Sequence, residues 1–305
     1  MYRLVVLLLG LLLVPPTARA EDDPYLLTID LGEAIRVLGD EDSFEREPLE
    51  ILLVGLGDRA VPALRKGLAT EDEAVRMGII EVLTETEAEG ASALLLERAK
   101  MDDSIYVRVE AISGLVSRDA PEAAEVVSSA LASDEPLLYR AAFGGCGRYC
   151  TSPEQLDRIV AFAFSEPVVQ MVGPRGALVR TAGIPEHRAA VVAALERGAA
   201  PKLVADDPEV RVRAAMLLAA LEDERAAPGL EVALDQEIAT MLRVQAIVAL
   251  GGVGNESTVT TVGASLATLS PLIRPAACKA LSILAYRGVE GASAEAVQRG
   301  CPGAK

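Results

Sequence analysis

The sequence predicts an all-α protein, an α-solenoid of stacked helical hairpins. A local pattern recurs about every 31 residues, and its apolar positions have the spacing of one helix face. Apolar residues make up 51% of the chain and are mostly small aliphatics, since there are no Trp, four Phe and six Tyr. Ala and Leu are strong helix formers, and small side chains let helix axes approach closely. Periodicity and composition therefore favour closely packed helices over a sheet.

The chain opens with features typical of a secretory signal peptide. Arg3 supplies a positive charge, Leu4–Val14 an apolar run, and Ala18-Arg19-Ala20 a small-x-small cleavage site. As a helix this run reaches about 16 Å, half of a hydrocarbon core of ~30 Å, which disfavours the alternative of an uncleaved membrane anchor. We expect cleavage between Ala20 and Glu21 and an exported protein, periplasmic or secreted, without a stable membrane anchor.

The net charge argues against two classes of partner. The chain carries 45 acidic and 29 basic residues, a formal net charge of −16, and loss of the signal peptide removes two arginines and brings the charge to −18. Such a field repels nucleic acid, whose binding depends on Lys and Arg that neutralise phosphates. We therefore expect no nucleic acid and no anionic membrane surface as a partner.

The repeated unit is clearest in "DPEVRVRAAMLLAAL", residues 207–221. We take Arg211 as the register position of this unit, because a cap residue lies four positions before it, Val one before, a small residue three after and Leu seven after. Strong or weak copies set the register at residues 76, 108, 139 or 140, 180, 211, 243 and 274, at intervals of 31 or 32 residues except for one of about 40. The register arginines are Arg76, Arg108, Arg180, Arg211, Arg243 and Arg274.

Each unit is predicted to consist of two helices joined by short turns. Asp72, Ser104 and Asp207 stand where the cap of the second helix belongs. Residues at −1, +3, +7 and +10 from the register position are expected to be buried. The residue at +2 varies among the copies and is expected to face solvent, so Arg211→Ala should destabilise the protein more than Arg213→Ala.

This register divides the chain into four segments. Residues 1–20 are the signal peptide, 21–41 an N-terminal capping segment, 42–300 the solenoid, irregular at about 139–206, and 301–305 a C-terminal tail. A hairpin of about 31 residues cannot bury its apolar stripe alone, so stacking supplies each unit with a continuous core.

The stretch "DPEVRVRAAMLLAALEDERAAPGLEVAL" resembles the HEAT repeat family, in its short form also known from phycobilisome-lyase-like repeats. The resemblance implies a right-handed superhelix whose second helices line the concave side. It also implies that Asp and Arg tie neighbouring units together, a role that falls by similarity on Asp72, Arg76, Asp207 and Arg211. Arg108, Arg243 and Arg274 lack an Asp at the matching position, which puts the tie in doubt there.

The four cysteines form two candidate disulfides if the chain is exported to an oxidising compartment. Cys278 lies in the last clear unit and Cys301 in the tail, and a bridge between them would hold the C terminus to the stack. Cys146 and Cys150 lie in "GGCGRYC", where glycines let the backbone leave the regular helix that would make their Cβ vectors diverge. Free buried thiols are the alternative for both pairs.

Aromatic residues gather where the repeat is irregular, and they are the candidate partner-binding residues. Packing of these rings into a gap at an irregular junction is the alternative and the more favoured one. Binding hot spots are rich in Tyr and Arg. The candidates are Tyr139, Phe143, Arg148, Tyr149, Phe162 and Phe164.

The sequence offers no catalytic, cofactor or metal site. The chain has one histidine, His187, and no nucleophile and base can be assembled around it. We therefore expect an exported, non-catalytic scaffold that binds a protein or peptide partner on its concave face. A lyase-like or chromophore-handling HEAT-repeat protein, implied by one branch of the resemblance, and a structural part of an envelope assembly are the alternatives.

Overall fold

A computed structural model describes residues 31–165 and 172–303 of the chain. The predicted signal peptide with its cleavage site, and residues 21–30 of the predicted capping segment, lie outside this part. Over the described residues the secondary structure is helical with no strand, so the predicted all-α solenoid is confirmed. Within the same ranges no helix is long and apolar enough to cross a membrane.

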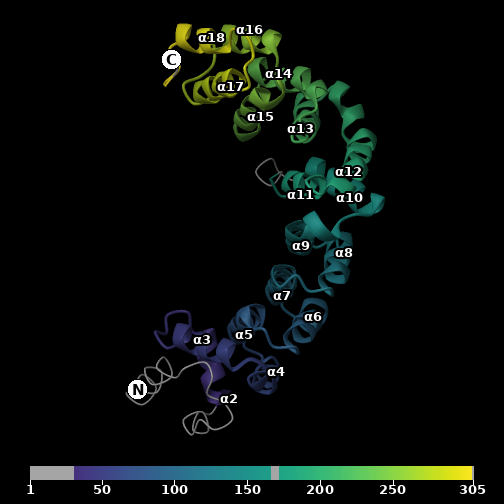
Figure 1. The fold of residues 1–305 in the computed structure, drawn as a ribbon, viewed down its shortest axis with the longest axis vertical. Coiled ribbons are helices and arrows are strands. Elements are labelled where there is room, and N and C mark those ends of the chain that lie inside the picture. The colour runs from purple at the N-terminus through teal and green to yellow at the C-terminus, as the bar shows by residue number, and fades with distance from the viewer. Residues whose placement is uncertain (1–30, 166–171, 304–305) are drawn as a thin grey trace. The chain divides into compact units, whose positions relative to one another are not determined.

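The chain divides into two compact units, one up to Ala142 and one from Phe143. In each unit the helices alternate between two rows, which we call the first-helix row and the second-helix row (Figure 1). The first helices are α4 (Val61–Gly67), α6 (Ala91–Met101), α8 (Ala123–Ala132), α10 (Pro153–Ser165), α12 (Pro185–Gly198), α14 (Ala227–Asp235), α16 (Glu256–Ser265) and α18 (Ala292–Gln298). The second helices are α5 (Glu73–Glu85), α7 (Ile105–Ser117), α9 (Pro136–Tyr149), α11 (Val172–Ala182), α13 (Pro208–Ala219), α15 (Thr240–Val253) and α17 (Arg274–Tyr286).

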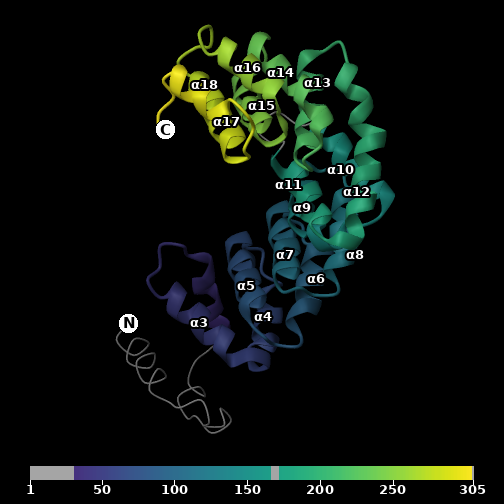
Figure 2. The same cartoon turned by 45° about the horizontal axis from the view of Figure 1, so that its top comes forward.

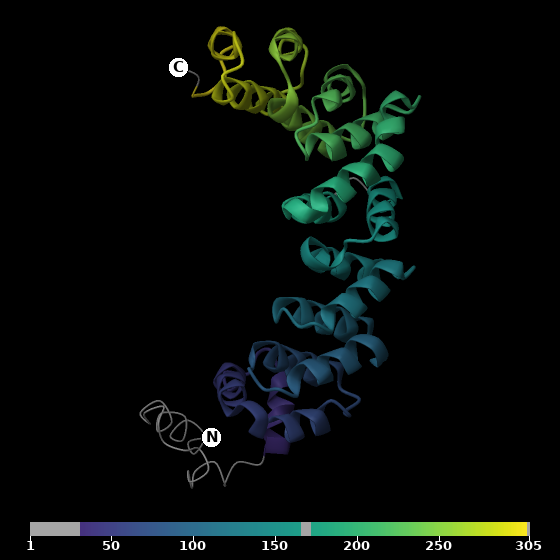
Figure 3. The ribbon, with the colours of Figure 1, turned by 45° about the vertical axis from the view of Figure 1, so that its right-hand side comes forward.

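Helices contact their neighbours in the same row as well as their hairpin partners. In the first unit α5 contacts its partner α4 and its row neighbour α7, and in the second α15 contacts α14 and α17 (Figure 2). Figure 3 shows the two rows for the C-terminal helices, drawn from green to yellow. The remaining elements are α2 (Leu31–Ala34), η3 (Ile35–Gly39), α3 (Arg46–Leu56) and η4 (Gly57–Arg59) before α4, with η6 (Ala200–Val204) and η7 (Glu224–Ala226) on either side of α13.

The predicted caps begin three second helices. The Asp72 carboxylate accepts hydrogen bonds from the backbone N–H groups of Ala74 and Val75, and Ser104 and Asp207 cap α7 and α13 in the same way. These side chains satisfy N–H groups that have no partner within the helix. The residues at −1, +3 and +7 of α5 and α15 are at most 5% exposed, so the predicted core positions are confirmed there.

The prediction that the +2 position faces solvent is wrong, because this position lies toward the preceding hairpin. Gly78 is buried, and a Cβ atom there would lie 2.5 Å from the carbonyl oxygen of Leu38 in η3. Arg213 is half-buried, and its Nη1 donates to the carbonyl oxygen of Ala163 in α10. The other +2 residues, Glu110, Gln245 and Ala276, are half-buried or buried. The residue at +2 therefore varies among the copies because the part of the preceding hairpin that it faces varies as well.

The assignment of Arg180 to the register position is also wrong. Arg180 lies in the last turn of α11, whereas the other register residues lie near the start of a second helix. Pro174, Ala177 and Leu178 are buried, and they match the buried +3, +6 and +7 positions of α5 if the register position is residue 171. The interval of 40 residues then lies after α11, where it holds α12 and η6.

All four cysteines are joined in disulfides, Cys146 with Cys150 and Cys278 with Cys301. The first pair links α9 to the residue that follows it, with the two Cα atoms 4.4 Å apart. The second links α17 to the segment after α18 across 23 positions of sequence, and its Cα atoms are 5.4 Å apart. Both predicted disulfides are therefore present, and the alternative of free buried thiols is wrong.

Candidate functional site

Four register arginines bind backbone carbonyls in their own hairpin, either at the end of the first helix or in the segment that connects it to the second. The last carbonyls of a helix have no partner within it and lie at the negative end of its dipole, so a guanidinium is a fitting donor. Arg76 donates to Thr70 (2.9 Å), Arg108 to Ala99 (3.4 Å), Arg211 to Ala205 (2.6 Å) and Arg243 to Leu234 (2.7 Å). Arg274 differs, since its donor bond goes to the carbonyl of Arg299 after α18. These arginines therefore hold the two helices of a hairpin together.

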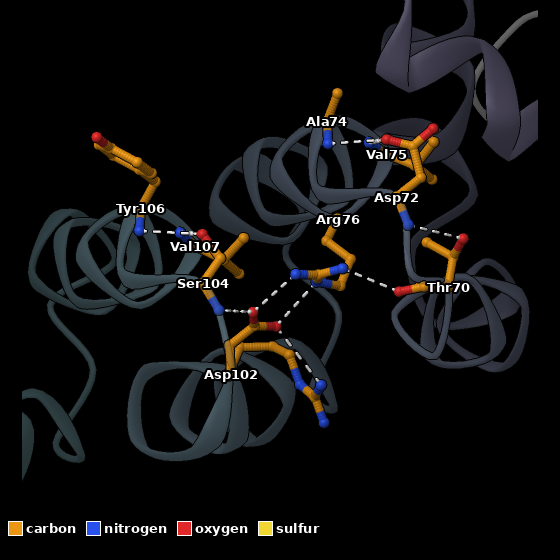
Figure 4. A network of polar contacts seen from close by, with 10 residues as sticks. Thr70, Asp72, Ala74, Val75, Arg76, Asp102, Ser104, Tyr106 and Val107 are labelled. Atoms are coloured by element: carbon orange, nitrogen blue, oxygen red, sulfur yellow. Dashed lines mark hydrogen bonds and ion pairs between the residues drawn. The ribbon is translucent and has the colours of Figure 1, made fainter.

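One register arginine also ties its hairpin to the next through a buried ion pair (Figure 4). Nε and Nη2 of Arg76 each lie 3.1 Å from an oxygen of Asp102, whose side chain is 1% exposed. Asp102 follows α6, so the pair spans two consecutive hairpins. Asp72, to which the resemblance gave the tie, instead caps its own helix. The tie thus exists at Arg76, but its acid comes from the following hairpin.

Two further arginines, missed from the sequence, connect neighbouring second helices. Arg118, at the end of α7, donates to the carbonyl oxygens of Leu83, Thr84 and Thr86 at the end of α5. Arg287, at the end of α17, donates to those of Gly251 and Gly254 at the end of α15. The residue after each arginine is left-handed, Asp119 with φ 55° and Gly288 with φ 78°. An arginine followed by a helix-terminating Gly or Asp is the signal that could have found this contact.

Exposed apolar side chains recur at the −2 position, in the first turn of α7, α9 and α15 and two residues before the start of α17. In the first unit Tyr106 is 58% and Leu137 is 37% exposed. In the second unit Met241 is 54% and Leu272 is 70% exposed. We call these four residues the −2 apolar set. The hairpins do not need these side chains for their cores, so the set is a candidate contact surface in each unit.

A family model of HEAT repeats matches residues 32–108, the segment that contains the Arg76–Asp102 tie. This segment therefore carries HEAT repeats. The match does not distinguish the phycobilisome-lyase-like branch from other HEAT repeats.

A solved structure with a TM-score above 0.5 supports the helical fold. The chain is similar to the Escherichia coli protein YibA, with a TM-score of 0.53, 17% identity, and coverage of 88% of this chain and 98% of that one. An engineered protein gives 0.46 at 18% identity, with 88% and 82% covered. Human deoxyhypusine hydroxylase in complex with glycerol gives 0.32 at 17% identity, with 84% and 97% covered. None of the curated proteins matches significantly.

The predicted aromatic candidates do not form one exposed surface. Tyr139 and Phe143 are 8% and 4% exposed, so burial removes them from reach of a partner. Arg148 is exposed and Tyr149 half-buried in α9. The half-buried Phe162 and Phe164 belong to α10, a first helix, and each is already covered by a cation. Phe162 meets the edge of Phe143 at 5.9 Å and lies 5.3 Å from Cζ of Arg158, and Phe164 lies 4.6 Å from Nζ of Lys202.

The described part of the chain contains no group of three His, Cys, Asp or Glu residues that could hold a metal ion. Its strongest electrostatic effect falls on an exposed cluster at the start of η7. There the Arg225 guanidinium holds the pKa of the Asp223 carboxyl below its usual value by hydrogen bonding to it. Asp223 also accepts from the backbone N–H of Arg225 as the cap of η7, which fits a structural role.

Proposed function

We propose that this HEAT-repeat protein is an exported, non-catalytic scaffold that binds an extended peptide segment of a protein partner along its second-helix row. The observation that carries the proposal is the −2 apolar set, which repeats on consecutive second helices of each unit. Contiguous exposed apolar patches mark interaction surfaces, and in this proposal the side chains of the set form one such patch in each unit.

The spacing of the set defines the partner. Neighbouring packed helices lie roughly 8–10 Å apart, and an extended chain advances roughly 3.3 Å per residue. A peptide that crosses the row would therefore meet one apolar residue of the set with about every third side chain. Helix α5 of the first unit also carries the exposed carboxylates of Glu73 and Glu85. A peptide with apolar residues three apart and basic residues between them fits this surface best.

The test is selection of such peptides from a random library with the purified wild-type protein, followed by affinity measurement on variants. Replacing Tyr106 and Leu137 by Ala together should weaken binding at least tenfold, about 1.4 kcal/mol, with only a small drop in melting temperature, since Tyr106 is 58% and Leu137 is 37% exposed. Met101→Ala is the matched control, because Met101 is 74% exposed but ends a first helix. Equal affinity of wild type and double variant, or loss in the Met101 control, would contradict the proposal.

Export is a separate part of the proposal and rests on residues 1–20. N-terminal sequencing of protein recovered outside the cytoplasm should begin at Glu21. A chain that keeps Met1 and stays in the membrane fraction would overturn this part and leave the peptide-binding part standing.

A further inference from the structure

Three consecutive hairpins of the first unit place equivalent residues six positions before the register. These are Thr70, Asp102 and Ser133, and each side chain accepts a hydrogen bond from the backbone N–H two residues later. The three bonds measure 3.3, 3.0 and 3.1 Å. The shared turn shows that Ser133 occupies in its hairpin the place that Asp102 occupies in the hairpin before.

The arginine that should face Ser133 has no carboxylate. Arg76 pairs with Asp102 through two bonds of 3.1 Å. Arg108 is the register arginine of the next hairpin, and its counterpart of Asp102 is Ser133, which is shorter and uncharged. Within the described residues the side chain of Arg108 makes one hydrogen bond, from Nε to the carbonyl oxygen of Ala99 at 3.4 Å. The terminal nitrogens of a half-buried guanidinium are left for another acceptor.

A cavity of about 410 Å³ opens at this place. Its polar lining includes Arg108, Lys100 and the hydroxyls of Ser129 and Ser133. Its apolar lining includes Ile112, Val126 and Leu138, which are 2–3% exposed. A water molecule takes about 30 Å³, so the cavity has room for a carboxylate and a small apolar group attached to it.

We propose that this cavity binds a carboxylate carried on a small apolar group, with the carboxylate on Arg108 in the place that Asp102 takes on Arg76. A planar guanidinium matches a carboxylate by two parallel hydrogen bonds. Lys100 adds a second positive charge, which its ion pair with Glu125 at 2.6 Å offsets. The local balance of one positive charge suits a monoanion better than a phosphate dianion in a chain whose net charge is −16.

The ligand chemistry has two sources, a free short-chain carboxylic acid or the C-terminal residue of a peptide. The probes are isovalerate, its amide, and a short peptide that ends in Val with a free or an amidated C terminus. Binding is followed on the full-length protein by chemical-shift changes of the backbone amides around the cavity. Isovalerate and the free peptide should bind, and both amides should not.

The deciding variant is Ser133→Asp, which supplies the missing carboxylate from the chain itself. It should weaken isovalerate binding at least tenfold and raise the melting temperature, because Arg108 gains the partner that Arg76 has. Arg108→Gln, which keeps a donor for Ala99, should also weaken binding tenfold and serves if the first variant fails to fold. Ala132→Ser is the control, since it adds a hydroxyl at an exposed lining residue, and it should bind as the wild type does.

Tighter binding of the free peptide than of isovalerate identifies a C terminus as the source, and the reverse identifies a free acid. Unchanged isovalerate binding in Ser133→Asp and Arg108→Gln would overturn the proposal. Equal binding of acid and amide, or no shift changes with either acid, would overturn it as well. The proposal does not depend on peptide binding by the −2 apolar set.

Discussion

The Arg76–Asp102 pair offers the sharpest test of how these hairpins are held together. We consider Arg76→Met, which keeps the bulk of the side chain but removes its charge. The change breaks two hydrogen bonds of 3.1 Å to Asp102 and one of 2.9 Å to the Thr70 carbonyl, and it leaves a carboxylate that is 1% exposed. An uncompensated buried charge is the dominant penalty.

The magnitude follows from what Asp102 keeps. Breaking a buried ion pair by removing one partner destabilises a protein by about 3–5 kcal/mol. Asp102 retains Nη1 of Arg98 at 3.6 Å and the backbone N–H of Ser104 at 3.0 Å, so we expect the lower end, about 3 kcal/mol. Adding Asp102→Leu replaces the pair with apolar side chains and removes the buried charge. The double variant should therefore be more stable than the sum of the two single effects predicts, by at least ~2 kcal/mol.

The matched control is Arg211→Met at the same register position. Arg211 is half-buried and donates to the carbonyls of Ala205 and Asp206 without a carboxylate partner, so its loss should cost about 1–2 kcal/mol. Urea unfolding gives the global values, and amide hydrogen exchange in α5 and α6 locates the effect, because stability in such an array is roughly nearest-neighbour. If Arg76→Met destabilises no more than Arg211→Met, or the coupling is below ~0.5 kcal/mol, the reasoning fails.

Three further outcomes are expected. Gly78→Ala should lower the free energy of unfolding by about 1–3 kcal/mol, since the new Cβ would lie 2.5 Å from a backbone oxygen. Gly144→Ala, whose Cβ would have nothing within 4 Å, should instead raise the free energy of unfolding by up to ~1 kcal/mol. Denaturant unfolding checks both values. Cys301→Ser should lower the free energy of unfolding by about 3 kcal/mol, the loop-closure value for a 23-residue separation, and this difference between variant and wild type should vanish when both proteins are reduced. Arg225→Gln should raise the pKa of Asp223 toward its usual value in a carboxyl NMR titration. Because the folded pKa of Asp223 is depressed, its carboxylate stabilises the folded protein above the unfolded pKa of 3.8, and this stabilisation is lost as pH falls through the folded pKa. The variant should therefore be less stable than the wild type at neutral pH and equally stable in strong acid.

Features set by residues close in sequence could be predicted well. The caps Asp72, Ser104 and Asp207 and the buried positions beside them depend on a few neighbouring residues, and the structure has them where the pattern placed them. The one register that failed, at Arg180, rested on a single Val-Arg pair. In α11 the buried set Pro174, Ala177 and Leu178 decides the register, and burial depends on packing between hairpins.

The partner of each arginine could not be predicted, because the repeated pattern contains the donor but not the acceptor. Arg76 and Arg108 occupy the same place in their hairpins, yet one faces Asp102 and the other faces Ser133, 25 or more residues later in the chain. A search for the acid near Arg76 in sequence finds Asp72, whose carboxylate is engaged in capping α5.

The same argument explains why the irregular places in such an array are the informative ones. Where the acid is present, the guanidinium is satisfied and the junction is closed, as at Arg76. Where the following hairpin has a serine instead, the fold is kept by apolar contacts such as Ile112 and Leu138, and a cation is left beside an open cavity. The core on either side does not depend on whether aspartate or serine stands six residues before the register position. This one position can therefore change from a tie between hairpins to part of a ligand site while the helices on either side stay the same.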